Sequence, residues 1–457
     1  MSVKASMQMT EGFLWGCATA AHQVEGDSVD DWSLWEEGVG RIYQDQRSGA
    51  ACEWWRGRFA EDFDRAATMR NNAQRISVAW SRIEPTEGQF DEAALGRYRE
   101  MLLALHERGM KPMVTLHHFT NPIWFADRGG WQADDAPSLF VRYARRVVES
   151  LGDLCALWCT INEPMVLATQ GYLFGYWTPG IKRLKAAAQV AANLLRAHAA
   201  AYHAIKAVQP NSQVGYAHHH LGIQPKAPAF WNRFAAQAAD QLMNNAFNDA
   251  FLTGVFKLPF SQPVTVASAK GALDWLGVQY YQERLATFNP LKLGNAIGTQ
   301  KPPGVPVGPD DWGGIVPENL FKVIERLYKR YGKPIYVTES GVPDPDDTLR
   351  PRYLAESVRA IWRALGFNYP VQGYFFWSLL DNFEWAEGYD PRFSFGLFRT
   401  NFETQARTQR MSAVLYREIC AHNGISAEII AQYVPDLLPK LFPGAPGAPQ
   451  VRLKERF

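Results

Sequence analysis

Eight short runs of apolar and β-branched residues recur along this chain, with helix-period segments between them. Such a run is typical of a strand buried on both faces, and strands of that kind belong to parallel sheets. The runs cover residues 13–17, 74–79, 112–116, 157–161, 213–217, 273–278, 334–337 and 372–376. Eight strand-helix units in a row predict an α/β fold, a single closed (β/α)₈ TIM barrel with elaborated βα loops.

No Pro, Gly or Ser-rich linker divides the middle of the 457-residue chain, so we expect one catalytic barrel domain over residues 1–441. Residues 289–314 are rich in Gly and Pro and predict a long loop before the seventh unit. Residues 442–457 begin with a Pro and Gly-rich stretch that cannot continue a helix. They predict a separate C-terminal tail.

Charge and cysteine content limit the kinds of binding partner and the cellular location that we expect for this chain. Lys and Arg number 47 against 46 Asp and Glu, and the net charge of +1 provides no field to attract nucleic acid or an anionic membrane. No apolar run reaches the roughly 18 residues of a spanning helix. The five scattered cysteines favour a reducing, cytoplasmic location and have no metal-ligand spacing. We therefore expect a neutral small-molecule partner. The sequence leaves open whether the chain forms a homo-oligomer.

Polar residues directly follow several of the eight runs. In a (β/α)₈ barrel all strands end at the same face, where such enzymes assemble their active sites. These side chains should therefore converge on one pocket. They include His22 and Gln23, His117 and His118, Asn162 and Glu163, Glu339, Trp377 and Glu384.

Two glutamates stand out among them. Glu163 lies in residues 160–164 (TINEP) and Glu339 in residues 336–341 (YVTESG). Two carboxyls from separate strand ends can face each other across one sugar ring, where one supplies a proton and the other meets the positive charge at the anomeric carbon. This placement alone leaves inverting, retaining and structural roles open.

The motifs around these residues resemble those of glycoside hydrolase family 1, the β-glucosidase family, over residues 10–433. The resemblance implies the same (β/α)₈ fold and no metal or other cofactor. It is carried by residues 13–20 (FLWGCATA), 23–26 (QVEG), 80–83 (WSRI), 160–164 (TINEP), 338–341 (TESG) and 377–385 (WSLLDNFEW).

By this resemblance Glu163 is the general acid/base and Glu339 the nucleophile. Arg75 and Tyr281 resemble the arginine and tyrosine beside the family nucleophile. A neighbouring cation should hold Glu339 ionised, and the resulting charge should keep Glu163 protonated. When the sugar esterifies Glu339, that charge disappears and Glu163 can act as a base.

The resemblance also implies a set of sugar contacts. Hydroxyl groups need polar partners, because a buried polar group left unpaired costs about 1–3 kcal/mol. Trp377 is expected beneath the sugar ring and Trp385 beside it. The hydroxyls are expected to meet Gln23, His118, Asn162 and Glu384. His117 next to His118 lacks a third ligand with metal spacing, so we predict no metal.

Three departures from the family pattern concern this site. Ser340, after the nucleophile, and Gln279 stand where Asn is common, so the hydrogen bonds around Glu339 are expected to differ. Phe119 follows His118 where a Trp is usual. These changes affect the expected preference for glucose.

The predicted function is that of a retaining exo-acting β-glycosidase that acts on small β-glycosides or short oligosaccharides. We expect mainly β-glucosidase activity, with β-galactosidase or β-fucosidase activity in addition. A 6-phospho-β-glycosidase is one alternative, but Glu384 occupies the position of its phosphate-binding Ser. A transglycosidase would use Tyr176, Trp177 and Trp312 as an acceptor site. A sugar-binding protein without turnover is the third alternative.

Overall fold

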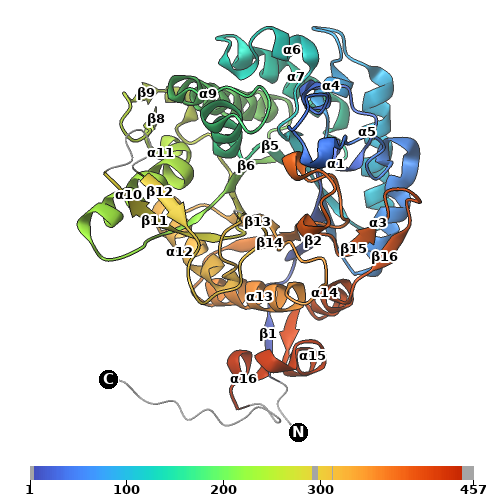
Figure 1. The fold of residues 1–457 in the computed structure, drawn as a ribbon. Coiled ribbons are helices and arrows are strands. Elements are labelled where there is room, and N and C mark those ends of the chain that lie inside the picture. The colour runs from blue at the N-terminus through green and yellow to red at the C-terminus, as the bar shows by residue number, and fades with distance from the viewer. Residues whose placement is uncertain (1–4, 291–296, 311, 445–457) are drawn as a thin grey trace.

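The structure is a computed structural model that describes residues 5–290, 297–310 and 312–444. Its centre is a closed barrel of eight parallel strands in the order β10-β13-β14-β2-β3-β4-β5-β6 (Figure 1). All eight predicted strands are confirmed. They are β2 (Leu14–Ala18), β3 (Ala73–Ser77), β4 (Lys111–His117), β5 (Leu157–Asn162), β6 (Gln213–His219), β10 (Trp275–Gln279), β13 (Ile335–Ser340) and β14 (Val371–Phe376).

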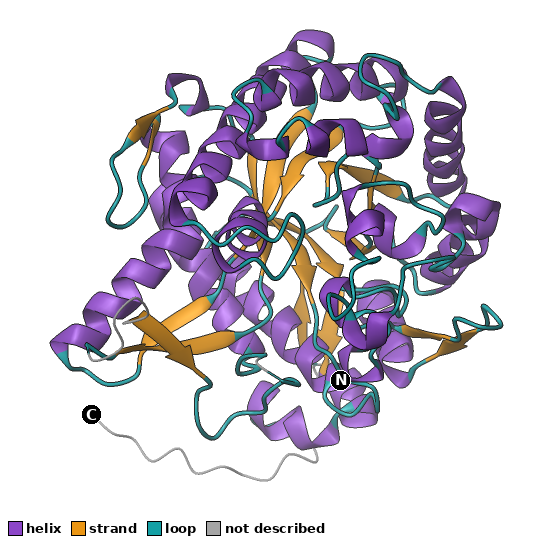
Figure 2. Ribbon diagram, turned by 45° about the horizontal axis from the view of Figure 1, so that its top comes forward, coloured by secondary structure: helices purple, strands orange, loops and turns teal. Residues whose placement is uncertain are grey.

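A main helix follows each barrel strand and packs around the outside (Figure 2). In α12, Leu320, Ile324 and Leu327 are buried along one face, and the helix ends at Gly332 with φ of 63°, a left-handed conformation that glycine adopts easily. The eight helices are α3 (Phe59–Thr68), α5 (Glu92–Glu107), α7 (Ala136–Leu151), α9 (Leu184–Val208), α11 (Ala246–Thr253), α12 (Leu320–Tyr331), α13 (Arg350–Gly366) and α14 (Met411–His422).

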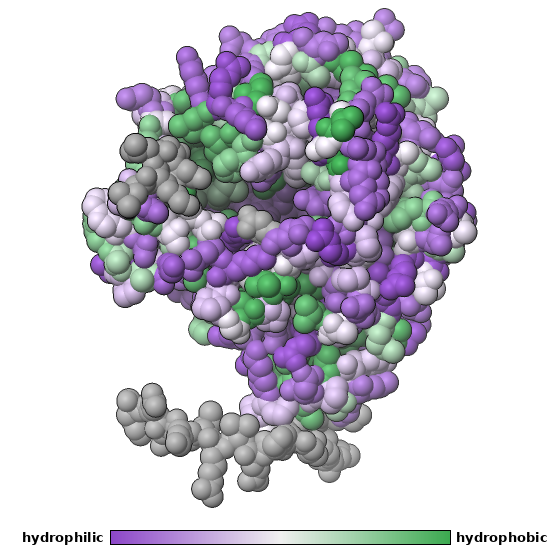
Figure 3. Space-filling view, viewed as in Figure 1, coloured by the Kyte–Doolittle hydropathy of each residue, from purple (hydrophilic) through white to green (hydrophobic). Residues whose placement is uncertain are grey.

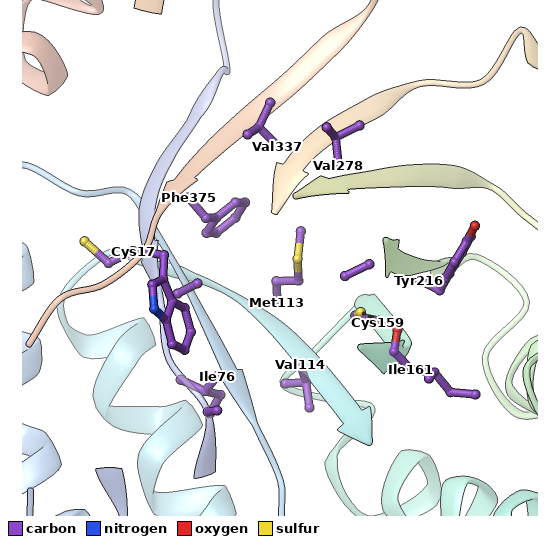
Figure 4. Packing of buried hydrophobic residues seen from close by; sticks show 14 of the residues in the cluster. Cys17, Ile76, Met113, Val114, Cys159, Ile161, Tyr216, Val278, Val337 and Phe375 are labelled. Atoms are coloured by element: carbon purple, nitrogen blue, oxygen red, sulfur yellow. Dashed lines mark hydrogen bonds between the residues drawn. The ribbon is translucent and has the colours of Figure 1, made fainter. Parts of the chain in front are cut away.

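Side chains fill the barrel and its immediate surroundings, as Figure 4 shows for Met113, Val278 and Phe375 among others. These three are fully or almost fully buried. Strands buried on both faces explain why the sequence runs are continuously apolar rather than alternating. The packed interior leaves the carboxyl ends of the strands as the place for a site.

A second sheet, outside the barrel, elaborates the loops at that end. It has the order β12-β11-β7 and contains β7 (Gly222–Pro225), β11 (Glu283–Phe288) and β12 (Ile297–Gln300). The helix α10 (Phe230–Asp240) packs against it through a small apolar cluster that includes Ala235 and Ala286. The segment predicted as a long loop, 289–314, thus contains a strand, although residues 291–296 and 311 lie outside the described residues.

The two ends of the described chain meet outside the ring of helices, beside α13 and α14 (Figure 1). β1 (Ser6–Gln8) pairs antiparallel with β17 (Gly424–Ser426), and α15 (Ala427–Tyr433) and α16 (Leu438–Leu441) follow (Figure 1). Of the predicted tail at 442–457, residues 445–457 lie outside the described residues, so the division at residue 441 stays a prediction. Over the described part of the chain, no helix combines the length and apolar character needed to cross a bilayer.

Candidate active site

The two predicted glutamates lie at the carboxyl ends of β5 and β13. Glu163 directly follows β5 and caps the short helix α8 (Pro164–Leu167) with φ of 43° and ψ of 60°, a left-handed conformation that is costly for glutamate. Glu339 lies in β13, whose pairing with β10 and with β14 shifts register beside it. Such irregularities re-aim side chains at strand ends, and here both carboxyls face one cavity.

Glu339 is held by the two side chains predicted to support it. Arg75, fully buried on β3, donates to Oε1 of Glu339, and the Tyr281 hydroxyl donates to Oε2 at 2.5 Å. Both contacts stabilise the ionised carboxylate. The two contacts thereby fix the orientation of the carboxylate.

The charge state of Glu339 reflects two opposing effects. Burial raises its pKa, the nearby Glu163 raises it further, and Arg75 and Tyr281 lower it; the result is a pKa of about 7. The expectation that a neighbouring cation should hold Glu339 ionised is therefore incomplete, because desolvation opposes Arg75 with greater effect.

The amide of Asn162, on β5, links the same arginine to Gln279 of β10. Its Oδ1 accepts from Arg75 Nη2 at 2.6 Å and from Gln279 Nε2 at 2.8 Å. Within the described residues its Nδ2 is buried without a hydrogen-bond partner. A buried donor in that state is available to a ligand hydroxyl.

Ser340, one of the unusual residues, points away from the carboxylate. Its hydroxyl lies 2.8 Å from the Tyr353 hydroxyl, on the side opposite Glu339. Successive side chains of a strand face opposite sides, so the residue after Glu339 turns out of the barrel. The altered hydrogen bond at the site comes instead from Gln279, through Asn162.

Glu163 has a neighbour that the sequence analysis missed. His219 Nδ1 lies 3.2 Å from Glu163 Oε1, and the two side chains are 13% and 10% exposed. His219 ends β6, the fifth barrel strand. The rule used for the other strands, that polar residues at a strand end belong to the site, points to it as well.

The predicted sugar-contact residues gather on the other side of the cavity. Gln23 Nε2 donates to Glu384 Oε2 at 3.3 Å and to the Phe383 carbonyl at 2.7 Å. Within the described residues, Gln23 Oε1 is buried without a partner. Desolvation, followed by the charges of Glu387 and Glu339, raises the pKa of Glu384 well above its usual value. This pair offers both donors and acceptors to a polar ligand.

Aromatic rings complete this side. Trp385 packs at 5.0 Å from Phe119 and stacks at 5.7 Å on His22, with ring planes 7° apart. His118 lies 6.3 Å from Trp377 and has a buried Nδ1 without a partner within the described chain. Burial lowers the pKa of His118 well below its usual value, so its ring is neutral and can donate as well as accept.

One cavity of about 1810 Å³ joins these groups. Gln23 and Arg75 do not line it but bond to residues that do. The predicted acceptor residues Tyr176, Trp177 and Trp312 line it too. The other predicted site residues line it directly: His118, Asn162, Glu163, Tyr281, Glu339, Trp377, Glu384 and Trp385.

No metal centre accompanies this cavity in the described residues, where no group of three or more His, Cys, Asp or Glu side chains is arranged to hold an ion. His117 Nε2 instead lies 3.0 Å from Asn121 Oδ1. Two carboxyls face a polar and aromatic pocket at the strand ends of a (β/α)₈ barrel, an arrangement suited to the hydrolysis of glycosides.

Comparison with known proteins agrees with an enzyme that hydrolyses glycosides. The profile described as glycosyl hydrolase family 1 matches residues 5–425. The chain belongs to this family, and it is a β-glycosidase with the retaining mechanism general to the family.

Individual relatives cover nearly the whole chain. Beta-glucosidase A of Thermotoga maritima is 29% identical over 93% of this chain and 100% of its own length. The cytosolic beta-glucosidase of Homo sapiens is 31% identical over 93% of this chain and 100% of its own length. Among solved structures, a beta-glycosidase from Pyrococcus horikoshii is 34% identical with a TM-score of 0.86, covering 94% of this chain and 98% of that protein.

Proposed function

We propose that this chain is an exo-acting β-glucosidase in which Glu339 is the nucleophile and Glu163 the acid/base. The observation that carries the assignment is the asymmetry between the two carboxyls. Glu339 is contacted by a guanidinium and a phenol, which both favour the anion, whereas Glu163 is contacted by the imidazole of His219. The better stabilised carboxylate is the one suited to attack.

In the first step Glu339 attacks the anomeric carbon while Glu163 gives its proton to the leaving oxygen. The bond from the anomeric carbon to that oxygen breaks, its electron pair stays with the oxygen, and a glycosyl ester forms on Glu339. The Tyr281 hydroxyl and Arg75 hold the carboxylate in line during the attack. The alcohol then leaves past Glu163.

In the second step Glu163, now ionised, takes a proton from water. The oxygen of that water attacks the anomeric carbon, and the ester bond to Glu339 breaks with its electrons returning to the carboxylate. Two inversions give net retention of the β configuration. His219 orients Glu163 in both steps through the contact to Oε1.

The donor sugar is placed by Gln23, His118, Asn162 and Glu384, with Trp377 and Trp385 beside the ring. The unpartnered Nδ2 of Asn162 and Oε1 of Gln23 are buried groups for which sugar hydroxyls are suitable partners. A β-glucoside is the preferred donor, and β-galactosides or β-fucosides are weaker ones. The names of the relatives, which include a beta-galactosidase of Pyrococcus woesei at 30% identity, support this range.

A 6-phosphorylated donor is disfavoured by charge. Glu384, Glu387 and Asp310 all line the cavity, and a phosphate group would add negative charge where burial and the charge of Glu387 already raise the pKa of Glu384. No cation contacts Glu384 among its described hydrogen bonds.

The proposal is tested with nitrophenyl β-glycosides of glucose, galactose, fucose and 6-phosphoglucose, with proton NMR of the first-formed sugar. We expect the glucoside to have the highest kcat/KM and its first product to be the β anomer. A faster 6-phosphoglucoside would contradict the donor assignment.

A further inference from the structure

His22, in the short helix α1 (Ala21–Val24), lies behind the sugar pocket rather than in it. Figure 3 shows this face of the molecule hollowed where the cavity opens, and His22 is not among the described residues that line the cavity. Its side chain is fully buried, yet both ring nitrogens have acidic partners. Desolvation offsets much of the attraction in a buried ion pair, so stability alone does not explain this arrangement.

The imidazole is held between two carboxylates. Its Nδ1 lies 3.0 Å from Asp30 Oδ2, and its Nε2 lies 2.7 Å from Glu36 Oε1. Asp30 Oδ1 accepts from the Ser33 amide at 2.9 Å. Glu36 Oε2 accepts from the amide and the hydroxyl of Ser48 at 2.7 and 2.9 Å. Burial lowers the pKa of His22, but the two carboxylates outweigh it and raise the pKa to about 10, so the ring is a cation fixed in orientation.

This imidazolium stacks on the indole of Trp385, the first residue of η8 (Trp385–Glu387). The ring planes are 7° apart and the centroids 5.7 Å apart, and a cation within about 6 Å of an indole centroid is attracted to the ring. Trp385 lines the cavity, and its φ of 51° is a left-handed conformation that is costly for tryptophan. Side-chain contacts must therefore hold Trp385 in place, and His22 supplies one of them.

The neighbours of His22 and Trp385 in the chain are also in contact. Gln23 Nε2 donates to Glu384 Oε2 at 3.3 Å and to the Phe383 carbonyl at 2.7 Å. Two successive residues of α1 therefore dock on three successive residues at the start of η8, through one ring stack and two hydrogen bonds. In the proposed function Trp385 and Glu384 contact the sugar, so a shift of His22 would move both.

We propose that His22 is a positioning residue for the donor sugar. Anchored by Asp30 and Glu36, its ring holds the indole of Trp385 and, through the neighbouring contacts, the carboxyl of Glu384. This inference rests on the proposed function and adds to it a residue that contacts no substrate atom. Donor selectivity should therefore depend on a cation behind the pocket.

The test variant is His22→Phe, which keeps a flat ring beside Trp385 and removes the charge and both carboxylate contacts. The donors are the nitrophenyl β-glucoside, β-galactoside and β-xyloside. The galactoside differs from the glucoside in the orientation of the hydroxyl at carbon 4, and the xyloside lacks the hydroxymethyl group. We expect kcat/KM for the glucoside to fall about tenfold, because its contacts are displaced. Its ratios to the galactoside and to the xyloside should each fall about threefold or more.

A purely structural role of His22 would give a different result. Partial unfolding lowers the concentration of active enzyme, which reduces the rate for every donor by the same factor and leaves KM and the donor ratios unchanged. Loss of positioning should instead raise KM for the glucoside and change the ratios.

The matched control is His198→Phe. His198 is another fully buried histidine, 2.6 Å from Thr160 Oγ1 and 2.7 Å from the Ala272 carbonyl, and it does not line the cavity. This variant should lower the melting temperature and leave the donor ratios unchanged.

Glu36→Gln is a milder second variant, which decides the matter if His22→Phe does not fold. It removes one of the two charges beside His22, so the donor ratios should move in the same direction by a smaller factor. Unchanged KM and donor ratios in His22→Phe, or in Glu36→Gln where only that variant folds, would overturn the inference alone. The same change of ratios in His198→Phe would also overturn it. If the wild type turned over none of the β-glycosides, the proposed function would be wrong and this inference with it.

Discussion

His219 connects the two glutamates of the site. Its Nδ1 lies 3.2 Å from Glu163 Oε1, and its ring stacks on Tyr281 with centroids 5.8 Å apart and planes 15° apart. The Tyr281 hydroxyl in turn donates to Glu339. One imidazole therefore contacts the proposed acid/base and packs against the side chain that holds the proposed nucleophile.

His219→Phe keeps the stacking on Tyr281 but removes the contact to Glu163. We expect kcat/KM for an alkyl β-glucoside to fall about tenfold, the effect of one positioning hydrogen bond. A dinitrophenyl glucoside should lose less, because its leaving group needs little protonation. His219→Asn, which restores a polar atom near the Nδ1 position, should recover most of the activity. Equal losses in the two variants on both substrates would contradict the positioning role.

Tyr281→Phe removes a hydrogen bond that favours ionised Glu339. The pKa of Glu339, about 7 in the wild type, should rise in this variant. The rise should be about one unit for a hydrogen bond worth about 1.4 kcal/mol. Because attack requires the anion, the acid limb of kcat/KM should move to higher pH, while Arg75, Glu163 and Glu384 remain as the other ionisable neighbours. Tyr280→Phe, whose hydroxyl donates to the Val316 carbonyl instead, is the matched control and should not move the limb. If the acid limb of kcat/KM moved to lower pH in Tyr281→Phe, the result would contradict the role of this hydrogen bond.

Much of this architecture follows from local sequence. The eight runs are short, apolar and spaced by helices, and that pattern specifies a closed parallel barrel whose strand ends meet. The convergence of His118, Asn162 and Glu339 follows from that geometry. The inward direction of Glu339 and the outward direction of Ser340 follow from the alternation of a strand.

Other features depend on contacts that local sequence does not encode. In the second sheet β7 pairs with β11, about 60 residues later in the chain. Its third strand, β12, lies in the stretch rich in Gly and Pro, which on composition alone is typical of a loop. The contact between His219 and Glu163 depends on the pairing of β5 with β6, which shifts register between Cys159 and Asn162. The pKa of Glu339 depends on burial, which a motif does not report.

His22 should make stability depend on pH. Burial alone would lower its pKa, but Asp30 Oδ2 at 3.0 Å and Glu36 Oε1 at 2.7 Å outweigh burial and raise it to about 10. Glu25 and Asp31 are the other acidic groups that interact with it. Since the folded pKa exceeds the unfolded value of about 6.5, the stabilisation is complete below about pH 6.5 and is lost as pH rises through 10.

The wild type should therefore lose several degrees of melting temperature between pH 7 and 10. The variant His22→Gln should melt lower at pH 7 and lose less over that interval. The difference between the two proteins isolates His22 from other titrating groups. A difference in melting temperature that does not change with pH would contradict a charged His22.

Glu163→Ala should separate the two steps. With a dinitrophenyl β-glucoside the first step needs little acid, so the glycosyl-enzyme should accumulate and kcat should fall at least a hundredfold. Azide, which attacks the anomeric carbon without a base, should restore turnover and give the β-glucosyl azide. In Glu339→Ala azide should give the α product, since it replaces the nucleophile itself. The same anomer from both variants would contradict the division of roles.

The most direct test of the account is to trap the intermediate. A 2-deoxy-2-fluoro β-glucoside with a dinitrophenyl leaving group should react in the first step, while the fluorine slows hydrolysis of the ester. We predict that mass spectrometry of the digested protein will place one fluoroglucosyl group on the peptide that contains Glu339, with none on the peptide that contains Glu163. A label on Glu163, or inverted product with no covalent adduct, would contradict it.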